Sequence, residues 1–444
     1  MKLHSLKDVT KGEFRVAALA GAAALAFSPL AQAQAEKSAE ERIQELERKI
    51  EILAEEIEGE RREALVVEQK YDTQLGVGPA GSKIYQAGES RVTIGGYGEA
   101  FYLNSEDKGK DEADFLRNVL YFGYRFSDRI LFNSEIEIEH ADEIFVEFAY
   151  LDFLFNEYFN VRAGMMLTPL GFVNEVHEPQ FFFGNLRPPV ETQIIPSTTR
   201  ENGVGIYGRL ADQVDYRLYV QNSFNGAGIS ESNLRGLRQK GSNAKANDLA
   251  VTGRLDWNPM AGVTLGASFW SGKMGHDDTF NGESVDMQMD LYDVRAQYRY
   301  GGLQLRALYT KAEIDDTLAV SQQLSADKGG ADIAIGEEME GWYVEAGFDI
   351  FTLMDNSPAR QSLYPWVRYS EIDSQASIDQ AVLDAGFTKK PKNDRNVTEV
   401  GLHYMPHPNV VIKAEVRDWE SDDDSGADGT NNQTEYVLGI GYNY

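Results

Sequence analysis

Apolar and polar residues alternate along most of the chain that follows residue 90. In the segment 91–102, RVTIGGYGEAFY, the residues Val92, Ile94 and Tyr102 share one face, whereas Arg91 and Glu99 share the other. A period of two is typical of β-strands that have one apolar face and one polar face. The pattern predicts sixteen strands, at 91–103, 114–126, 130–140, 144–155, 159–168, 202–210, 214–223, 248–257, 262–271, 286–300, 303–312, 341–351, 363–372, 397–405, 409–418 and 435–444.

The connections between these strands alternate between short turns and long polar loops, with two exceptions: 140–143 is short where a loop is due, and 352–362 is long where a turn is due. A soluble sandwich or solenoid also has alternating strands, and it buries its apolar face against a second sheet. An even number of strands of about ten residues, with alternating connections and many charges in mid-strand, instead favours a closed 16-stranded antiparallel transmembrane β-barrel. We therefore predict that residues 90–444 form this barrel, with the apolar face toward lipid and the charged face toward the lumen.

The first 89 residues show no period of two. Basic residues, a short apolar run and the sequence Ala31-Gln32-Ala33 predict a cleaved signal peptide at 1–33. Residues 36–63 carry a heptad seam with charged flanks, which predicts a short periplasmic α-helical coiled coil rather than a lone amphipathic helix. The segment 64–89 is rich in glycine and is predicted to be a linker. The seam residues alternate in spacing by three and four, and they are Ile43, Leu46, Ile50, Leu53 and Ile57.

Composition excludes several classes of function. The net charge of -29 argues against nucleic acid as a partner, because phosphate binding needs a basic surface. There are no cysteines, so the chain has no disulfide, no thiolate metal site and no covalent haem. The six histidines are scattered, and the common hydrolase and metalloprotease motifs are missing from the sequence. We predict a protein that is not an enzyme and has no metal or cofactor. The run 420–429 is acidic and is predicted to be a solvated loop, since the glutamate that closes a calcium loop is missing.

The charged face of the predicted strands carries equal numbers of acidic and basic residues, so the acidic excess lies mainly outside the wall. Rings of charge set ion preference through a local field, although many such charges pair across strands and only stiffen the wall. The predicted pore-lining residues are Arg91, Glu99, Arg117, Arg125, Glu135, Glu137, Asp152, Arg162, Arg217, Arg254, Arg295, Arg299, Arg306, Arg368, Lys413 and Arg417.

The connection 168–202 contains five prolines and the triplet Phe181-Phe182-Phe183. Proline lowers the entropy of a loop, and an apolar triplet is unfavourable in water. Two interpretations remain open: the loop folds into the lumen as a constriction, or the triplet makes a contact between subunits. In the first case the candidate constriction residues are Glu175, His177, Glu178, Arg187 and Arg200.

Several stretches resemble the phosphate-selective porin O and P family: 148–172, 194–208, 363–371 and 404–416. The order of signal peptide, coiled coil, linker and barrel is also similar, and the likeness covers most of 90–444. The resemblance implies a trimeric sixteen-stranded channel with an inward-folded third loop. The implied trimer conflicts with the Ile and Leu seam, which favours a coiled coil of two helices. Phosphate-selective members rely on clustered Arg and Lys at the constriction, whereas 169–201 offers only Arg187 and Arg200.

The sequence thus predicts a bacterial outer-membrane porin, a passive aqueous channel for small hydrophilic solutes or ions, with anions such as phosphate as the narrower candidates. The expected partners are membrane lipid and lipopolysaccharide and two further copies of the chain in a homotrimer. The alternative is a structural barrel sleeve or scaffold that holds a partner protein such as a cytochrome.

Overall fold

The computed structural model describes residues 48–49, 75–86, 90–105, 110–354, 358, 360–421 and 432–444. The chain divides into the units Met1–Glu68 and Gln69–Tyr444, and all the strands lie in the second unit. The predicted signal peptide and the five seam residues of the predicted coiled coil lie outside the described residues, as does most of the acidic run at 420–429.

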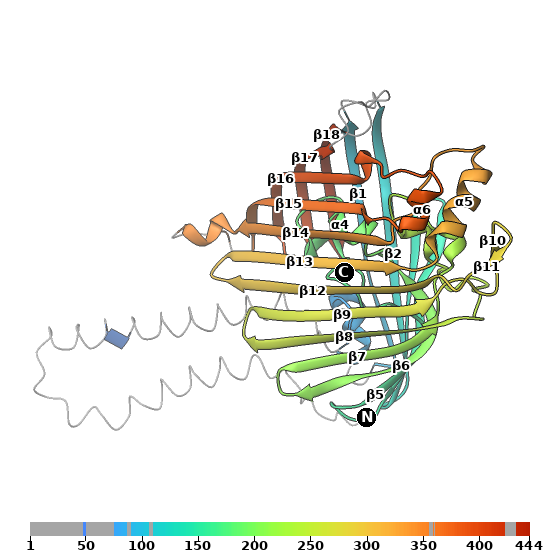
Figure 1. The fold of residues 1–444 in the computed structure, drawn as a ribbon. Helices are drawn as coiled ribbons and strands as arrows, with labels where there is room; N and C mark the ends of the chain where they lie inside the picture. Colours follow the sequence, from blue (N-terminus) through green and yellow to red (C-terminus); the bar gives the residue numbers. More distant parts are fainter. Residues whose placement is uncertain are drawn as a thin grey trace, which may run out of the picture. The chain divides into compact units, whose positions relative to one another are not determined.

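Sixteen antiparallel strands form one closed barrel, which confirms the predicted fold of residues 90–444 (Figure 1). The barrel strands are β1 Val92–Ser105, β2 Lys110–Ser127, β3 Ile130–Glu139, β4 Glu143–Leu154, β5 Asn160–Leu167, β6 Arg200–Ala211, β7 Val214–Asn222, β8 Leu249–Met260, β9 Val263–Lys273, β12 Gln288–Tyr300, β13 Leu303–Ile314, β14 Glu338–Phe348, β15 Ser362–Ser377, β16 Asp394–His407, β17 Val410–Ser421 and β18 Gln433–Asn443. Two short strands outside the barrel, β10 Thr279–Phe280 and β11 Glu283–Ser284, form a hairpin.

The described helices are short, and none of them is part of the barrel wall. The α-helices are α3 Pro79–Ser82, α4 Val190–Gln193, α5 Thr317–Asp327 and α6 Gln380–Asp384. The 3₁₀-helices are η2 Lys83–Gln86, η3 Pro179–Phe181, η4 Gly226–Gly228, η5 Arg235–Leu237, η6 Ile350–Leu353 and η7 Pro391–Asn393. Among the residues that the structure describes, no helix is both long and apolar enough to cross a membrane.

The barrel closes where β1 pairs with β18, with Ala100 opposite Ile440. Gly96 and Tyr444 exchange two backbone hydrogen bonds at this seam, of 3.0 Å and 2.8 Å. Closure removes the two free edges that an open sheet of these strands would present for aggregation.

The two faces of the wall differ as the alternation predicts. On β18, Tyr436 and Leu438 are 42% and 58% exposed, whereas Val437 between them is fully buried. On β1, Ile94 is exposed and Glu99 is buried. The outward face is therefore apolar, which suits hydrocarbon, and the charged face is turned into the lumen.

The two ends of the barrel differ in the length of their connections. Figure 1 shows tight turns at one end, and α5, α6, β10 and β11 in the long loops at the opposite end. We call these the turn end and the loop end. Both predicted exceptions are confirmed: the β3–β4 connection has three residues, 140–142, and the β14–β15 connection holds η6. The chain enters β1 at the turn end, since Val92 pairs with Tyr124 next to the β2–β3 turn.

Candidate functional site

The connection between β5 and β6, residues 168–199, folds into the lumen, and we call it the inward loop. It is bonded to the wall at widely separated strands. The Gly171 N–H donates to Asp293 on β12 at 3.0 Å, and Tyr343 on β14 donates to Glu191 at 2.7 Å. Lys413 on β17 donates to the Gly184 carbonyl at 2.6 Å. These bonds reach across the barrel, so the loop narrows the lumen.

The phenylalanine triplet lies within this loop. Phe182 and Phe183 are buried, and the Phe183 ring stacks on Trp366 with the ring centroids 5.9 Å apart. His403 meets the same ring edge-on at 5.6 Å. Of the two sequence-based interpretations, the structure therefore supports packing inside the lumen for these two rings.

The turn that starts the inward loop depends on Gly171. This residue has a φ of +57°, and a Cβ there would lie 2.3 Å from Oε2 of Glu191. The same carboxylate oxygen accepts the N–H groups of Phe172 and Val173 at 2.6 Å and 2.8 Å. The loop thus folds around a buried carboxylate that takes the place of a regular backbone partner.

Most predicted pore-lining residues face the lumen and are buried there: Glu99, Arg117, Glu135, Glu137, Asp152, Arg162, Arg217, Arg254, Arg295, Arg306, Arg368, Lys413 and Arg417. Arg125 and Arg299 are half-buried. Arg91 precedes β1 and is exposed, so it lies at the rim rather than on the lumen wall.

The wall charges neutralise one another in networks. Asp256 accepts from Arg217 at 3.1 Å, and from Arg254 and Arg295 at 2.6 Å each. Farther around the wall, Glu399 accepts from Arg368 at 2.5 Å and Arg417 at 3.0 Å. Side chains along a water-filled passage would be exposed, whereas these are almost completely covered. The lumen is therefore filled at their level.

A second segment fills the turn end of the lumen. Residues 75–86, which hold α3 and η2, belong to the predicted linker, yet they pack inside the barrel, and we call them the plug. Val77, Ala80 and Ile84 are 2%, 3% and 1% exposed. No pattern in the sequence indicated this structure, because the plug has no apolar period.

Polar groups of the wall satisfy the backbone and side chains of the plug. Asn133 donates to the Gly81 carbonyl at 2.9 Å, and Arg125 donates to the Ile84 carbonyl at 3.0 Å. The Tyr85 hydroxyl donates to Asp152 at 2.5 Å. Each bond replaces a hydrogen bond to water that the buried group has lost, so specific contacts with the wall hold the plug in place.

The plug and the inward loop meet inside the lumen. The Ala80 N–H donates to Oε1 of Glu178 at 3.1 Å. A Cβ on Gly76 or Gly78 would lie only 2.4 Å or 2.2 Å from the carboxylate of Glu175 or Glu178, so glycine permits the close approach. Burial raises the pKa of Glu178 to about 7, although bonds from Asn443 and Ala80 oppose this rise.

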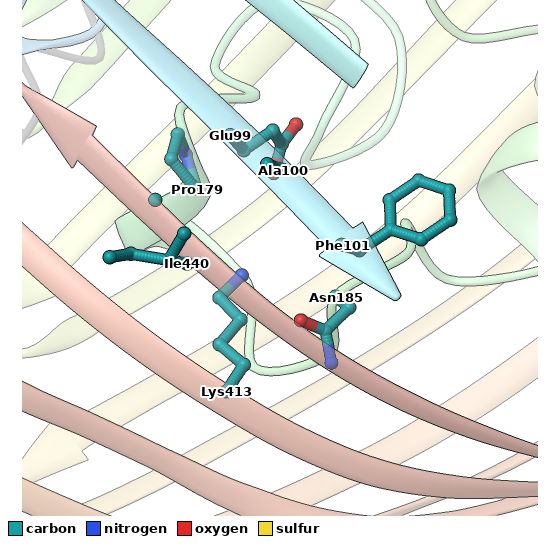
Figure 2. A pocket seen from close by; sticks show the side chains of 8 residues that line it. Glu99, Ala100, Phe101, Pro179, Asn185, Lys413 and Ile440 are labelled. Carbon is teal, nitrogen blue, oxygen red and sulfur yellow. The ribbon is translucent and has the colours of Figure 1, made fainter. Parts of the chain in front are cut away.

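Figure 2 shows how closely the inward loop fits the wall. Pro179 and Asn185 of the loop face Glu99 on β1 and Lys413 on β17. The cavity between them has a volume of about 10 Å³, which is about the minimum that holds one water molecule. No solute larger than water fits between loop and wall at this position.

The five candidate constriction residues are all in the lumen. Glu175 bridges Arg217 at 3.0 Å and Arg254 at 3.3 Å. Glu178 holds the plug. His177 and Arg200 both contact Glu147 on β4, at 2.8 Å and 3.1 Å. Burial lowers the pKa of His177, but the charge of Glu147 overcomes this and raises it to about 9.

A cluster of five basic residues lies at the loop end, and we call it the basic cluster: Arg187, Arg200, Arg235, Arg238 and Lys240. Arg235 and Arg238 both donate to the Ser197 carbonyl, the latter at 3.1 Å. In the described part of the chain, only Arg200 of the five forms an ion pair with a carboxylate.

The members of the basic cluster repel one another. Burial and the charge of Arg238 lower the pKa of Arg235, and burial and the charge of Arg200 lower the pKa of Arg238. Burial, followed by the charge of Arg117, also lowers the pKa of Arg187. An arginine side chain stays charged at neutral pH, so Arg187, Arg235 and Arg238 present positive charge that no carboxylate of the described residues pairs with.

Three members of this cluster were not among the sequence-based candidates. Arg235, Arg238 and Lys240 lie in the connection between β7 and β8. The stretch RGLRQK holds three basic residues within six positions, in a chain of net charge -29. That local reversal of charge was the available signal.

The closed antiparallel barrel of sixteen strands, narrowed by an inward loop, has the fold of the bacterial porins. Salmonella typhi OmpF in a complex with daunomycin matches with a TM-score of 0.52 at 13% identity, over 80% of this chain and 97% of that one. An anion-selective porin from Comamonas acidovorans matches with a TM-score of 0.51 at 12% identity, over 80% and 99%. The channel DcaP of Acinetobacter baumannii matches with 0.51 at 14%, over 80% and 97%.

Within this fold, the chain belongs to the same family as an uncharacterised protein of Aquifex aeolicus (strain VF5). The two are 36% identical over 366 residues, which cover 79% of this chain and 80% of the relative. No protein-family model matches the sequence. The narrower likeness to the phosphate-selective O and P family stays a prediction.

Proposed function

We propose that this protein is an outer-membrane channel that admits small anions and that the described conformation is its closed state. The observation that carries the proposal is the basic cluster: four of its five members have no carboxylate partner in the described part of the chain, whereas Asp256 and Glu399 each pair with arginines in the wall. An anion that enters from the loop end meets this charge where the β7–β8 connection contacts the inward loop at Ser197. Unpaired charge near a channel mouth selects ions through its local field.

Phosphate is the first anion to test. A guanidinium group matches the oxygens of phosphate with two parallel hydrogen bonds, and the cluster offers three guanidinium groups without a carboxylate partner among the described residues, those of Arg187, Arg235 and Arg238. Chloride is the suitable comparison, because it has the same sign but no such geometry. Preference for phosphate over chloride distinguishes recognition by guanidinium from simple attraction of charge.

The plug makes the proposed channel a gated one. It covers Arg162 and Asp152 near the turn end and meets the inward loop through Glu178. Solutes therefore pass only when the plug leaves the lumen or shifts within it. The plug has twelve residues, 75–86, and no covalent link to the wall other than the chain itself.

The test is single-channel recording in planar bilayers, with reversal potentials in a salt gradient. We expect rare, brief openings of the wild type and large, sustained conductance of a variant lacking residues 75–86. Tyr85→Phe removes the bond to Asp152 and is expected to increase the open probability about fivefold, since one buried hydrogen bond contributes about 1 kcal/mol.

Lys245→Gln is the matched control for the basic cluster. Lys245 lies in the same β7–β8 connection but pairs with Asp278, so its loss is expected to leave ion selectivity unchanged. If both the wild type and the plug deletion insert as folded barrels and carry no current, the proposal of a channel is wrong. If the variant without the plug prefers cations, the proposed preference for anions is wrong, while the proposal of a channel still holds.

We further propose that the barrel lies in the bacterial outer membrane, with the loop end outside against lipopolysaccharide and the turn end toward the periplasm. Short turns on the periplasmic side are the rule for such barrels. The homotrimer and the periplasmic coiled coil at 36–63 remain proposals. Native mass spectrometry of the detergent-extracted protein, with and without residues 36–63, measures the number of chains and the contribution of that segment.

The alternative of a sleeve around a partner protein receives no support from the lumen. The plug and the inward loop occupy the space that a threaded partner would need. A barrel that held a partner would have to expel both segments, and their buried polar bonds would then be lost.

A further inference from the structure

Three side chains that can bind a metal meet between the inward loop and the wall. They are Glu135 on β3, Glu147 on β4 and His177 in the inward loop, and one ligand atom of each lies within 4.8 Å of the others. Their exposed fractions are 0%, 1% and 1%. The group is thus a compact set of two carboxylates and one imidazole, removed from water, in which each residue comes from a different element.

The imidazole is oriented as a ligand would be. Nδ1 of His177 lies 3.2 Å from the Asn174 carbonyl, which can only accept a hydrogen bond, so Nδ1 carries the proton in that bond. Nε2 is thereby directed at the two carboxylates, 2.8 Å from Oε2 of Glu147 and 3.7 Å from Oε1 of Glu135. Histidine ligands of metals generally donate their other ring N–H to a backbone carbonyl or carboxylate, which fixes the ring.

The two carboxylates are also positioned to bind a cation. Arg200 donates to Oε1 of Glu147 at 3.1 Å, so Oε2 of Glu147 is the oxygen left to coordinate a metal ion. Tyr97 donates to Oε1 of Glu135 at 3.1 Å, whereas Oε2 of Glu135 is buried and has no hydrogen-bond partner in the part of the chain that the structure describes. A buried carboxylate oxygen without a partner is costly unless a cation or donor satisfies it.

The charge balance points the same way. No Arg or Lys among the described residues forms an ion pair with Glu135, whose one ion-pair contact in that range is with His177. With the imidazole neutral, the two carboxylates carry a charge of minus two, of which Arg200 on Glu147 offsets one, so the group still attracts a cation. Mixed nitrogen and oxygen ligands suit Zn²⁺ and its neighbours in the first transition row better than Ca²⁺ or Mg²⁺.

We propose that Glu135, Glu147 and His177 form a binding site for a divalent transition metal ion, which pins the inward loop to β3 and β4. The site differs from the basic cluster, and it stands whether or not the barrel conducts anions. Its ligands join the loop to the wall directly beside Glu178, which holds the plug. The metal therefore stabilises the constricted form of the lumen.

The test starts from the folded full-length protein in detergent, treated with a chelator and then dialysed. Titration calorimetry with Zn²⁺ is expected to show one site per barrel, and Co²⁺ is expected to give the visible absorption of a coordinated ion. His177→Ala and Glu135→Gln should each weaken Zn²⁺ binding at least tenfold and remove the Co²⁺ absorption.

His403→Gln is the matched control. His403 is also buried in the lumen, but it bonds to the Phe183 carbonyl and is not part of the three-residue group. This variant should bind Zn²⁺ as the wild type does. Because a variant can fail to fold, the melting temperature of each is measured with and without Zn²⁺, and the wild type and His403→Gln should be stabilised by the ion.

Two results would overturn the proposal. One is a folded wild type that binds neither Zn²⁺ nor Co²⁺, which would mean that a proton on His177 satisfies the carboxylates. The other is equal binding by the wild type and a folded His177→Ala variant, which would place the metal elsewhere in the chain.

Discussion

Arg368 in the wall and Arg235 in the basic cluster carry the same guanidinium group in opposite settings. Arg368 is fully buried and donates to Glu399 at 2.5 Å and 2.8 Å and to Glu345 at 2.7 Å. Arg235 is half-buried, donates to a carbonyl and has Arg238 as its strongest charged neighbour. The difference teaches that the charges of this lumen have two uses. Paired cations stabilise the barrel wall, and in the proposed channel the cations without carboxylate partners attract the solute.

The largest expected effect comes from breaking a pair in the wall. Arg368→Met leaves the carboxylates of Glu399 and Glu345 buried with fewer cationic partners. Removal of one partner from a buried ion pair costs about 3–5 kcal/mol, so the midpoint of urea unfolding in detergent should fall markedly.

The control for this change is Arg91→Met at the exposed rim, which should alter the unfolding free energy by less than about 0.5 kcal/mol. Equal stability of Arg368→Met and the wild type would show that the wall network is not a source of stability, and the contrast drawn above would fail.

A smaller effect, of a different kind, is expected from the basic cluster. In a plug-deleted background, Arg235→Gln combined with Arg238→Gln should lower the ratio of anion to cation permeability about tenfold. Two unit charges several ångströms from the ion path contribute on the order of 1–2 kcal/mol at an effective dielectric constant near 20. The unfolding free energy should change little, because these side chains have no carboxylate partners to lose. A large loss of stability with unchanged selectivity would show that Arg235 and Arg238 stabilise the fold and do not select ions.

The smallest effect is expected from Lys240→Gln. The Lys240 ammonium lies 5.2 Å from the centroid of the Phe145 ring, and it is the most flexible side chain of the cluster. We expect a two- to threefold decrease in the permeability ratio, on the order of 0.5 kcal/mol. The decrease should disappear in about 1 M salt, where the Debye length is about 3 Å. Persistence of the decrease in high salt would indicate a change of loop shape rather than a loss of charge.

The strands could be predicted because their physics is local. Alternation on segments such as 435–444 reports directly which side chain faces lipid, and all sixteen predicted strands are present in the barrel. Even the unusual short link after β3 and the long link after β14 were visible as sequence lengths. Every strand of a barrel has the same alternation of apolar and polar residues, so the pattern of one strand supports the prediction of the next.

The contents of the lumen could not be predicted in the same way. Half of the twelve plug residues are glycine, proline, alanine or serine, and the partners of the plug, such as Asn133 and Glu178, lie far away in the sequence. The inward loop was foreseen as one of two alternatives, but its bonds to β12, β14 and β17 depend on the closed barrel. Arg235 was missed because a basic residue in a long polar loop is usually solvated.

The tether between the plug and the wall limits how the channel can open. Only five residues separate Gln86 from Val92, and they span at most roughly 17 Å. Because β1 starts at the turn end, the plug can travel only a short way and only out through that end. In the proposed channel, the length of this tether therefore sets how far the plug can be displaced from the lumen.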